Sequence, residues 1–286
     1  MTVATPPRSR TAPILARVLR ARRLTPHLVR LVVGGPTLAA FEPNPHADSY
    51  VKLMFVPAGE RPMTDDGRVD GEALRAALPE GVVPRLRAYT VRAFDPDALE
   101  LTLDVVVHGD AGLAGPWAAA ATGGEEVLVL GPGGAWSPDP TMDHHLLLGD
   151  ASALPAIAVA LERLPADARG MAVIEVDGPD DALPLTAPPG VAIHWTHPRA
   201  GVAGQALVEA TMALEWPRGK VGVFLHGEAG AVRALRRYLR VEREVPRECL
   251  SVSGYWRLGV DDEGWRSRKK EWATSIEADE AAAGLA

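Results

Sequence analysis

The two halves of the chain differ in their hydrophobic pattern. In the first half, short apolar runs alternate with polar residues and are separated by turns that contain Gly and Pro, at residues 14–24, 27–35, 50–56, 87–92, 98–109 and 124–136. Alternation with a period of two is typical of strands. Short strands, frequent turns and no strong helical periodicity predict an antiparallel β-barrel. Residues 57–84 are a charged insertion, with one helical turn predicted around residues 72–78.

The second half has short apolar runs of the buried-strand type at residues 144–150, 171–178, 191–197 and 220–228. Helical stretches lie between or after them, at residues 153–164, 204–214 and 228–243. Strands that alternate with helices predict a parallel sheet covered by helices on both faces. We therefore expect a disordered arm at 1–12, a barrel domain at 13–138, an α/β domain at 139–268 and a C-terminal tail at 269–286.

Length, charge and cysteine content narrow the class of protein. A chain of 286 residues favours two domains, and a net charge of −7 argues against a general nucleic-acid binder. The single cysteine, Cys249, excludes an intrachain disulfide framework and cysteine-rich metal sites. No apolar run approaches the ~20 residues that cross a bilayer. We expect a cytoplasmic monomer with no nucleic-acid or membrane partner.

The most informative segment is Arg-Ala-Tyr-Thr-Val-Arg at residues 87–92. In a strand, Arg87 and Tyr89 share one face, and Thr90 lies on the other. A guanidinium offers a planar fork of donors for phosphate oxygens, a tyrosine offers a stacking surface, and a threonine hydroxyl can bond a ring nitrogen. The segment therefore fits a ligand with a diphosphate and a flat ring, such as a flavin. An ordinary strand with solvated arginines fits equally well.

Two other features suggest phosphate or dinucleotide binding. A glycine-rich loop at residues 108–117 opens into a predicted helix, whose N-terminus favours anions. The alternative is that residues 108–117 form only a tight loop before a helix and bind no anion. The loops at residues 149–152, 197–198 and 226–228 follow predicted parallel strands, where ligands of such sheets bind. No G-x-G-x-x-G fingerprint is present, so topology allows a dinucleotide site without demonstrating one.

The order of the motifs resembles a known family. RAYTVR, HG…GLAGPWA, LLLGDASALPAI, FLHGEAGAVRALRRYL and SGYWRLG follow one another as in the siderophore-interacting proteins. These are FAD-dependent ferric-siderophore reductases of the ferredoxin-reductase-like superfamily, and the resemblance spans roughly residues 14–268. It implies FAD on the barrel, NADH or NADPH on the α/β domain, and a ferric siderophore as substrate. Ferredoxin is a further possible electron donor.

The resemblance also implies roles for individual residues. Arg87 would hold the FAD pyrophosphate, Tyr89 would stack on the isoalloxazine and Thr90 would bond near its N5. The remaining FAD-site residues would be His108, Gly112, Ala114, Gly115, Trp117 and Trp256. The nicotinamide cofactor would face Gly149, Asp150, Ser152, Gly227 and Glu228. Lys52 and Arg257 would attract the negatively charged chelate.

Three positions depart from the family pattern. Ala151 stands where an acidic residue is common, Gly115 where Ser is usual, and Gly133 where an arginine is expected. The first departure puts the choice of electron donor in doubt. The third removes a cation, which should weaken recognition of highly anionic chelates.

Other chemistry has less support. The pairs His144/His145 and His194/His197 lack carboxylate or cysteine partners at ligand spacing, so no protein metal site is predicted. Cys249 lies in an apolar segment and is expected in the core. Two alternatives to a siderophore reductase stay open: a general NAD(P)H:flavin oxidoreductase that serves a protein acceptor, and a siderophore-binding protein without reductase activity.

Overall fold

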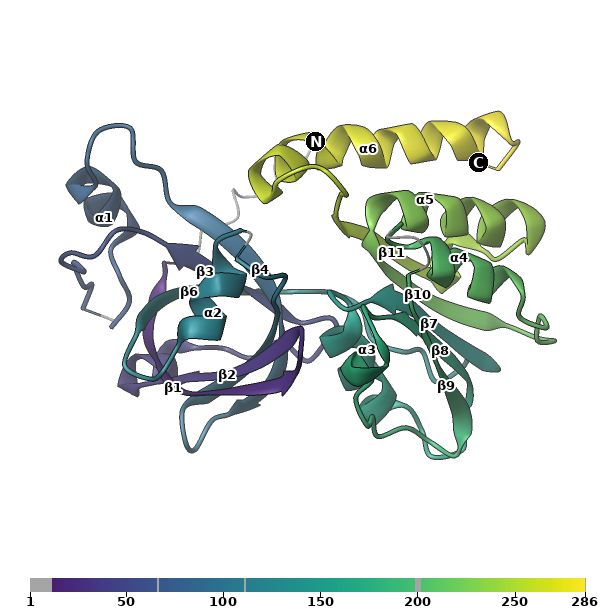
Figure 1. Cartoon of the computed structure of the whole chain (residues 1–286), viewed down its shortest axis with the longest axis horizontal. Coiled ribbons are helices and arrows are strands. Elements are labelled where there is room, and N and C mark those ends of the chain that lie inside the picture. Colours follow the sequence, from purple (N-terminus) through teal and green to yellow (C-terminus); the bar gives the residue numbers. More distant parts are fainter. Residues whose placement is uncertain (1–11, 66, 111, 199–201, 286) are drawn as a thin grey trace, which may run out of the picture.

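The first domain is a closed antiparallel barrel. The computed structural model describes residues 12–65, 67–110, 112–198 and 202–285, so almost all of the predicted N-terminal arm lies outside the described residues. The barrel strands run in the order β1-β2-β5-β4-β3-β6, with these bounds: β1 (Ile14–Thr25), β2 (Leu28–Gly34), β3 (Tyr50–Phe55), β4 (Arg85–Asp95), β5 (Glu100–Val106) and β6 (Glu126–Gly133). The predicted barrel is confirmed (Figure 1).

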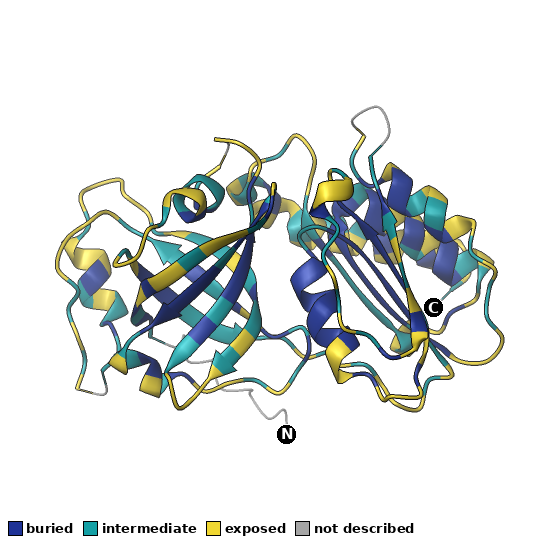
Figure 2. Cartoon of the chain, turned by 60° about the horizontal axis from the view of Figure 1, so that its bottom comes forward, coloured by how far each residue is buried: buried dark blue, intermediate teal, exposed yellow. Residues whose placement is uncertain are grey.

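Pairing of β1 with β6 closes the barrel, and alternation gives its strands a common apolar interior. On β2 and β5, Leu31, Val33, Leu101 and Leu103 are fully buried and point into one core. Figure 2 shows dark-blue buried stretches on the barrel strands beside intermediate and exposed ones. Three short helices accompany the strands: η1 (Pro36–Ala40) and α2 (Ala114–Ala120) pack on the barrel core, and α1 (Gly71–Ala77) in the charged insertion packs in a separate small cluster with Leu128 of β6. The start of α1 is stabilised because the Asp70 carboxylate accepts hydrogen bonds from two backbone N–H groups of its first turn.

The second domain is a parallel sheet of order β11-β10-β7-β8-β9. Its strands are β7 (His144–Asp150), β8 (Arg169–Glu175), β9 (Gly190–Thr196), β10 (Val221–Glu228) and β11 (Leu250–Trp256). Its helices include α3 (Leu154–Arg163), α4 (Gln205–Met212) and α5 (Ala229–Arg237). A π-helical turn, η3 (Tyr238–Glu242), continues α5. The 3-10 turns η2 (Pro179–Asp181) and η4 (Arg247–Cys249) lie in connections. Because α3 packs in one apolar cluster and α4 and α5 in another, the sheet is buried on both faces, as its apolar strands predict.

The two domains share part of one core and several polar contacts. Leu28 of β2 and Ala47 are buried in the same apolar cluster as α3. Arg92 of β4 forms an ion pair with Glu162 of α3, and the turn after β1 places His27 2.8 Å from the Asp181 carboxylate. These contacts hold the α/β domain against the barrel.

A long C-terminal helix, α6 (Asp262–Ala282), begins above the junction between the domains and runs over the α/β domain (Figure 1). It runs through the predicted domain boundary at residue 268, so much of the segment expected as a tail is ordered helix. Trp265 and Ile276 are buried, and the Trp265 and Trp272 rings meet edge to face at 5.4 Å. Within the described residues, no helix is long and apolar enough to cross a membrane.

The buried face of α6 generates a stability prediction. Ile276→Ala should lower the free energy of unfolding by about 2–5 kcal/mol, because it leaves a cavity under the helix. Arg268→Ala, at an exposed position of the same helix, should change it by less than about 0.5 kcal/mol. Equal effects in urea denaturation would show that α6 is not packed as described.

Candidate functional site

A cavity of about 1070 Å³ lies where the barrel, the parallel sheet and α6 meet. Its barrel wall includes Lys52, Arg87, Tyr89 and Thr90; its sheet wall includes Asp150, Ser152, Glu175 and Trp256; and α6 contributes Asp262, Trp265, Arg266 and Lys269. Ligand pockets are typically about 300–1,000 Å³. The cavity is therefore large enough for a ligand of dinucleotide size.

Strand β4 brings the RAYTVR segment to this cavity. Tyr89 packs against the barrel core and still lines the cavity, and burial raises the pKa of its phenol. Thr90 is buried and pairs in register with Tyr50 of β3, while Ala88 pairs with Lys52. Because directly opposed residues in an antiparallel pair point to the same side, Tyr50, Lys52 and Thr90 share one face of the β3–β4 ribbon.

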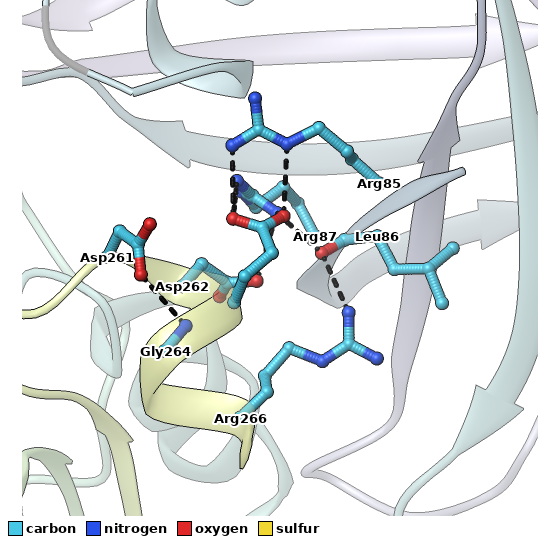
Figure 3. A network of polar contacts seen from close by, with 8 residues as sticks. Arg85, Leu86, Arg87, Asp261, Asp262, Gly264 and Arg266 are labelled. Carbon is cyan, nitrogen blue, oxygen red and sulfur yellow. Dashed lines mark hydrogen bonds and ion pairs between the residues drawn. The ribbon is translucent and has the colours of Figure 1, made fainter. Parts of the chain in front are cut away.

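The Arg87 guanidinium is held by the first turn of α6 (Figure 3). Its Nη1 donates to Asp262 Oδ2 at 3.0 Å and to Glu263 Oε1 at 2.7 Å, and its Nη2 donates to Glu263 Oε2 at 3.1 Å. Arg85 also donates to Glu263, from Nε to Oε1 at 3.1 Å and from Nη2 to Oε2 at 3.0 Å. Hydrogen bonds from Arg85 and Arg87 hold the pKa of Glu263 well below its usual range. An anionic ligand on Arg87 must therefore displace Glu263 or share the guanidinium with it.

The donor set fits FAD. Arg87 already binds a two-oxygen anion through both Nη atoms, which is the geometry that a diphosphate would use. An aromatic ring and a hydroxyl, Tyr89 and Thr90, follow on the same strand and line the same cavity. The roles taken from the resemblance remain predictions for these residues.

The glycine-rich loop is less well placed than its sequence suggests. His108 lines the cavity, with Nδ1 3.5 Å from the Asp177 carboxylate. Gly112, Ala114, Gly115 and Trp117 are not among the lining residues. A Cβ on Gly115 would approach Val106 O to 3.3 Å, and the Trp117 ring packs edge to face on Phe55. These residues fix α2 against the barrel in this structure.

The carboxyl edge of the sheet is built around Asp150. Its buried carboxylate accepts hydrogen bonds from Ser152 N at 2.9 Å, Glu228 N at 2.7 Å and Trp256 Nε1 at 2.8 Å. Burial raises the pKa of Asp150 despite these donors. The carboxylate thus ties β7 to β10 and β11 and holds the Trp256 indole at the cavity.

Two glutamates at the same edge occupy helix N-termini. Glu228 accepts from Gly230 N and Ala231 N at the start of α5, and Glu175 accepts from Gly204 N and Leu207 N at the start of α4. Of the residues predicted to face the nicotinamide cofactor, two line the cavity, Asp150 and Ser152. The other three are not among its lining residues: Gly149, Gly227 and Glu228. A Cβ on Gly149 would come within 2.8 Å of His226 O, so this glycine is explained by packing.

The two predicted substrate cations are placed differently. Lys52 lines the cavity. Arg257 does not, and its Nη1 lies 3.5 Å from Glu228 Oε1. The departure at Gly133 has a steric reason, since a Cβ there would lie 2.5 Å from Cζ of the Tyr50 ring. Tyr50 fills the space into which an arginine at position 133 would grow.

The alanine-rich tail from about residue 271 is expected to be helical from its sequence, but its packing on the molecule and the contribution of Lys269 to the cavity were missed. Trp265, Lys269, Trp272 and Ile276 recur at intervals of four, three and four residues, which is one helical face. That spacing could have identified the packed face of the helix. Within the part of the chain that the structure describes, no group of three His, Cys, Asp or Glu side chains could hold a metal ion. Cys249, expected in the core, is only half-buried.

Comparison with known proteins agrees with this geometry. Residues 17–136 match the siderophore-interacting FAD-binding domain, and residues 142–259 match the family described as siderophore-interacting protein. The crystal structure of a siderophore utilization protein from T. fusca is 37% identical, with a TM-score of 0.73 over 87% of this chain and 94% of that one. The predicted ferredoxin-reductase-like fold is confirmed, since a ferredoxin reductase shares it.

Two curated relatives are similar over nearly their whole length. An uncharacterized protein of Mycobacterium tuberculosis strain H37Rv is 46% identical over 274 residues, covering 90% of this chain and 94% of that protein. Ferric vibriobactin reductase ViuB of Vibrio cholerae is 32% identical over 268 residues, covering 91% of this chain and 95% of that protein.

The ion pairs of Figure 3 predict competition between Glu263 and FAD. Glu263→Gln should tighten FAD binding to the apoprotein about fivefold, because a neutral amide competes less well for Arg87 than a carboxylate does. Glu277→Gln is the matched control, because Glu277 lies on the same helix as Glu263 and pairs with the exposed Arg247. Weaker FAD binding in a fluorescence titration of Glu263→Gln would show instead that Glu263 orients Arg87 for its ligand.

His226 predicts a pH dependence of stability. Burial and the nearby Lys269 lower the pKa of His226 to about 3, against about 6.5 for an unfolded histidine. Protonation of His226 therefore favours the unfolded state. The free energy of unfolding should be highest above about pH 6.5 and should fall by up to about 1.4 kcal/mol for each unit by which the pH is lowered from 6 to 4. Denaturation of His226→Gln should show a shallower slope, whereas exposed His194→Gln should match the parent protein. Identical slopes would contradict the assignment.

Proposed function

Because the chain belongs to the siderophore-interacting protein family, we propose that it is an FAD-dependent reductase that takes electrons from NAD(P)H and reduces the iron(III) of a ferric siderophore, releasing iron(II). One observation supports this most: a single cavity combines the RAYTVR strand, the carboxyl edge of a parallel sheet and the Lys52 ammonium. The name of the relative ViuB, a ferric vibriobactin reductase, agrees with the proposal.

The barrel wall would hold the flavin. The Arg87 guanidinium would bind the diphosphate, with Arg85 beside it, and Tyr89 would stack on the ring system. Thr90 would place its hydroxyl at the ring edge, where it can donate or accept a hydrogen bond. When bound, FAD would supply the redox chemistry, accepting a hydride from the nicotinamide cofactor and passing electrons singly to iron.

The sheet wall would position the nicotinamide cofactor. Ligands of open parallel sheets bind beyond the carboxyl ends of the strands, where Asp150 and Ser152 line the cavity. Since the Asp150 carboxylate is already bonded to Trp256 and to backbone N–H groups, its proposed role is to position the indole and the 150–152 loop. Ser152, whose hydroxyl donates to the Asp150 carboxylate at 2.5 Å, would contact the cofactor as a hydrogen-bond acceptor.

Lys52 would attract the chelate. Hard oxygen donors hold iron(III) far better than iron(II), so reduction would loosen the metal without a protein ligand. An ammonium on the cavity wall suits a small anionic substrate better than a protein acceptor, which would meet charges on the outer surface.

The experiment is an absorbance titration of the purified protein. We expect flavin bands that bleach when NADH or NADPH is added without oxygen and return when a ferric siderophore follows, with iron(II) captured by a coloured chelator. Bleaching without recovery by any ferric siderophore would contradict the proposed substrate class. A protein that binds no FAD would contradict the reductase assignment altogether.

A further inference from the structure

Four ionisable side chains meet where the barrel faces the end of strand β8. His27 lies in the turn between β1 and β2, His108 follows β5, Asp177 follows β8 and Asp181 ends η2. His27 Nδ1 lies 2.8 Å from Asp181 Oδ2 and 3.6 Å from Asp177 Oδ2. His108 Nδ1 lies 3.5 Å from the same oxygen of Asp177. Both histidines therefore belong to the barrel, and both carboxylates belong to the α/β domain.

The contact with Asp181 is the firmer part of this cluster. The Asp181 carboxylate is buried, and its Oδ1 accepts the His27 backbone N–H at 3.0 Å, in addition to the ring contact through Oδ2. Burial opposes ionisation of Asp181, but hydrogen bonds from His27 and Thr25 hold its pKa below the usual value. Asp181 therefore stays an anion over the range in which histidines titrate, and it binds the His27 backbone whatever the charge on the ring.

The contacts of Asp177 depend on the charge of the imidazoles. Its side chain is 44% exposed, and among the described residues its ion pairs are those with His27 and His108. The two rings lie 6.3 Å apart between centroids, with 28° between their planes. Contacts of 3.5 and 3.6 Å are long for hydrogen bonds, so their strength comes mainly from opposite charge. A neutral imidazole attracts Asp177 little, whereas a protonated one carries a full positive charge.

Other charged groups near the cluster are committed to other partners. Arg23 Nη1 donates to Pro26 O in the β1–β2 turn at 2.6 Å, and Glu175 at the end of β8 caps α4. Arginine–carboxylate pairs between the domains, such as Arg92 with Glu162, keep their charges between about pH 5 and 8. Among the described residues, all three ion pairs that contain a histidine lie in this cluster. It is thus the part of the domain junction whose strength depends on pH in the neutral range.

We propose that these four residues form a proton-operated clamp between the two domains. Protonation of His27 and His108 pairs two imidazolium ions of the barrel with two carboxylates of the α/β domain, which holds the end of β8 against the barrel. Loss of these protons removes the attraction on Asp177 and leaves the bonds to Asp181, so the junction loosens as the pH rises. Because His108 and Asp177 line the cavity, the clamp controls how firmly its barrel and sheet walls are held together. It operates whichever ligand the cavity binds.

The His27 backbone N–H is a direct reporter of the clamp, because its hydrogen-bond acceptor lies in the other domain. Its protection factor compares its hydrogen-exchange rate with that of the same amide in an unfolded chain at the same pH. In the purified full-length protein we expect this factor to be about fivefold larger at pH 6 than at pH 8. The Val107 N–H donates to His27 O within the barrel at 2.9 Å and should show no such change.

Substitutions test whether the two histidines cause this pH dependence. In the double variant His27→Gln/His108→Gln, the amide at position 27 should have the same protection factor at both pH values, close to that of the parent protein at pH 8. Asp177→Asn should reduce the fivefold ratio while leaving the buried Asp181 contact in place. His194→Gln, at an exposed position of β9, should retain the ratio. A ratio near one in the parent protein, or an unchanged ratio in the double variant, would overturn the clamp.

Discussion

The cavity depends on the ion pairs between β4 and the first turn of α6. Arg87 has only 12% of its side chain exposed, while its partners Asp262 and Glu263 are 31% and 42% exposed, so water screens this contact less than it screens a fully exposed pair. It fixes the start of α6 above the barrel, while the buried Trp265 and Ile276 fix the helix on the α/β domain. The helix therefore spans the junction, and the sheet and barrel walls become parts of one cavity.

The same contact would couple flavin binding to the position of α6. The guanidinium proposed to hold FAD is held by the helix that places Lys269 in the cavity. A diphosphate that displaces Glu263 would loosen the first turn of α6, so the position of Lys269 should respond to flavin loading. The carboxylates at the sheet edge act differently: Asp150, Glu175 and Glu228 are committed to backbone N–H groups and stabilise loops and helix starts. Their direct role is to maintain the shape of the edge.

Much of the fold could be predicted from local pattern. Alternating apolar residues mark the barrel strands, and continuous apolar runs mark β7, β8 and β10, because each pattern reflects which faces are buried. The RAYTVR segment was identified by residue chemistry, and the structure places it at the cavity. A helical tail after about residue 271 follows from its alanine-rich composition, but its packing could not be predicted, because its surface is charged and its buried face appears only every three or four residues. Arg257 lies outside the cavity lining because Glu228, distant in sequence, attracts it.

The amino-acid sequence by itself determined the two-domain architecture, the family and the strand that bears Arg87, Tyr89 and Thr90, since these follow from local periodicity and from motifs read in order. Tertiary structure alone decided which charges face one another. It placed Glu263 on Arg87, Lys269 on the wall of the same cavity as Lys52, and the Tyr50 ring over Gly133. The physical reason is that electrostatic and steric contacts depend on distances between segments far apart in the chain, and no local pattern encodes those distances.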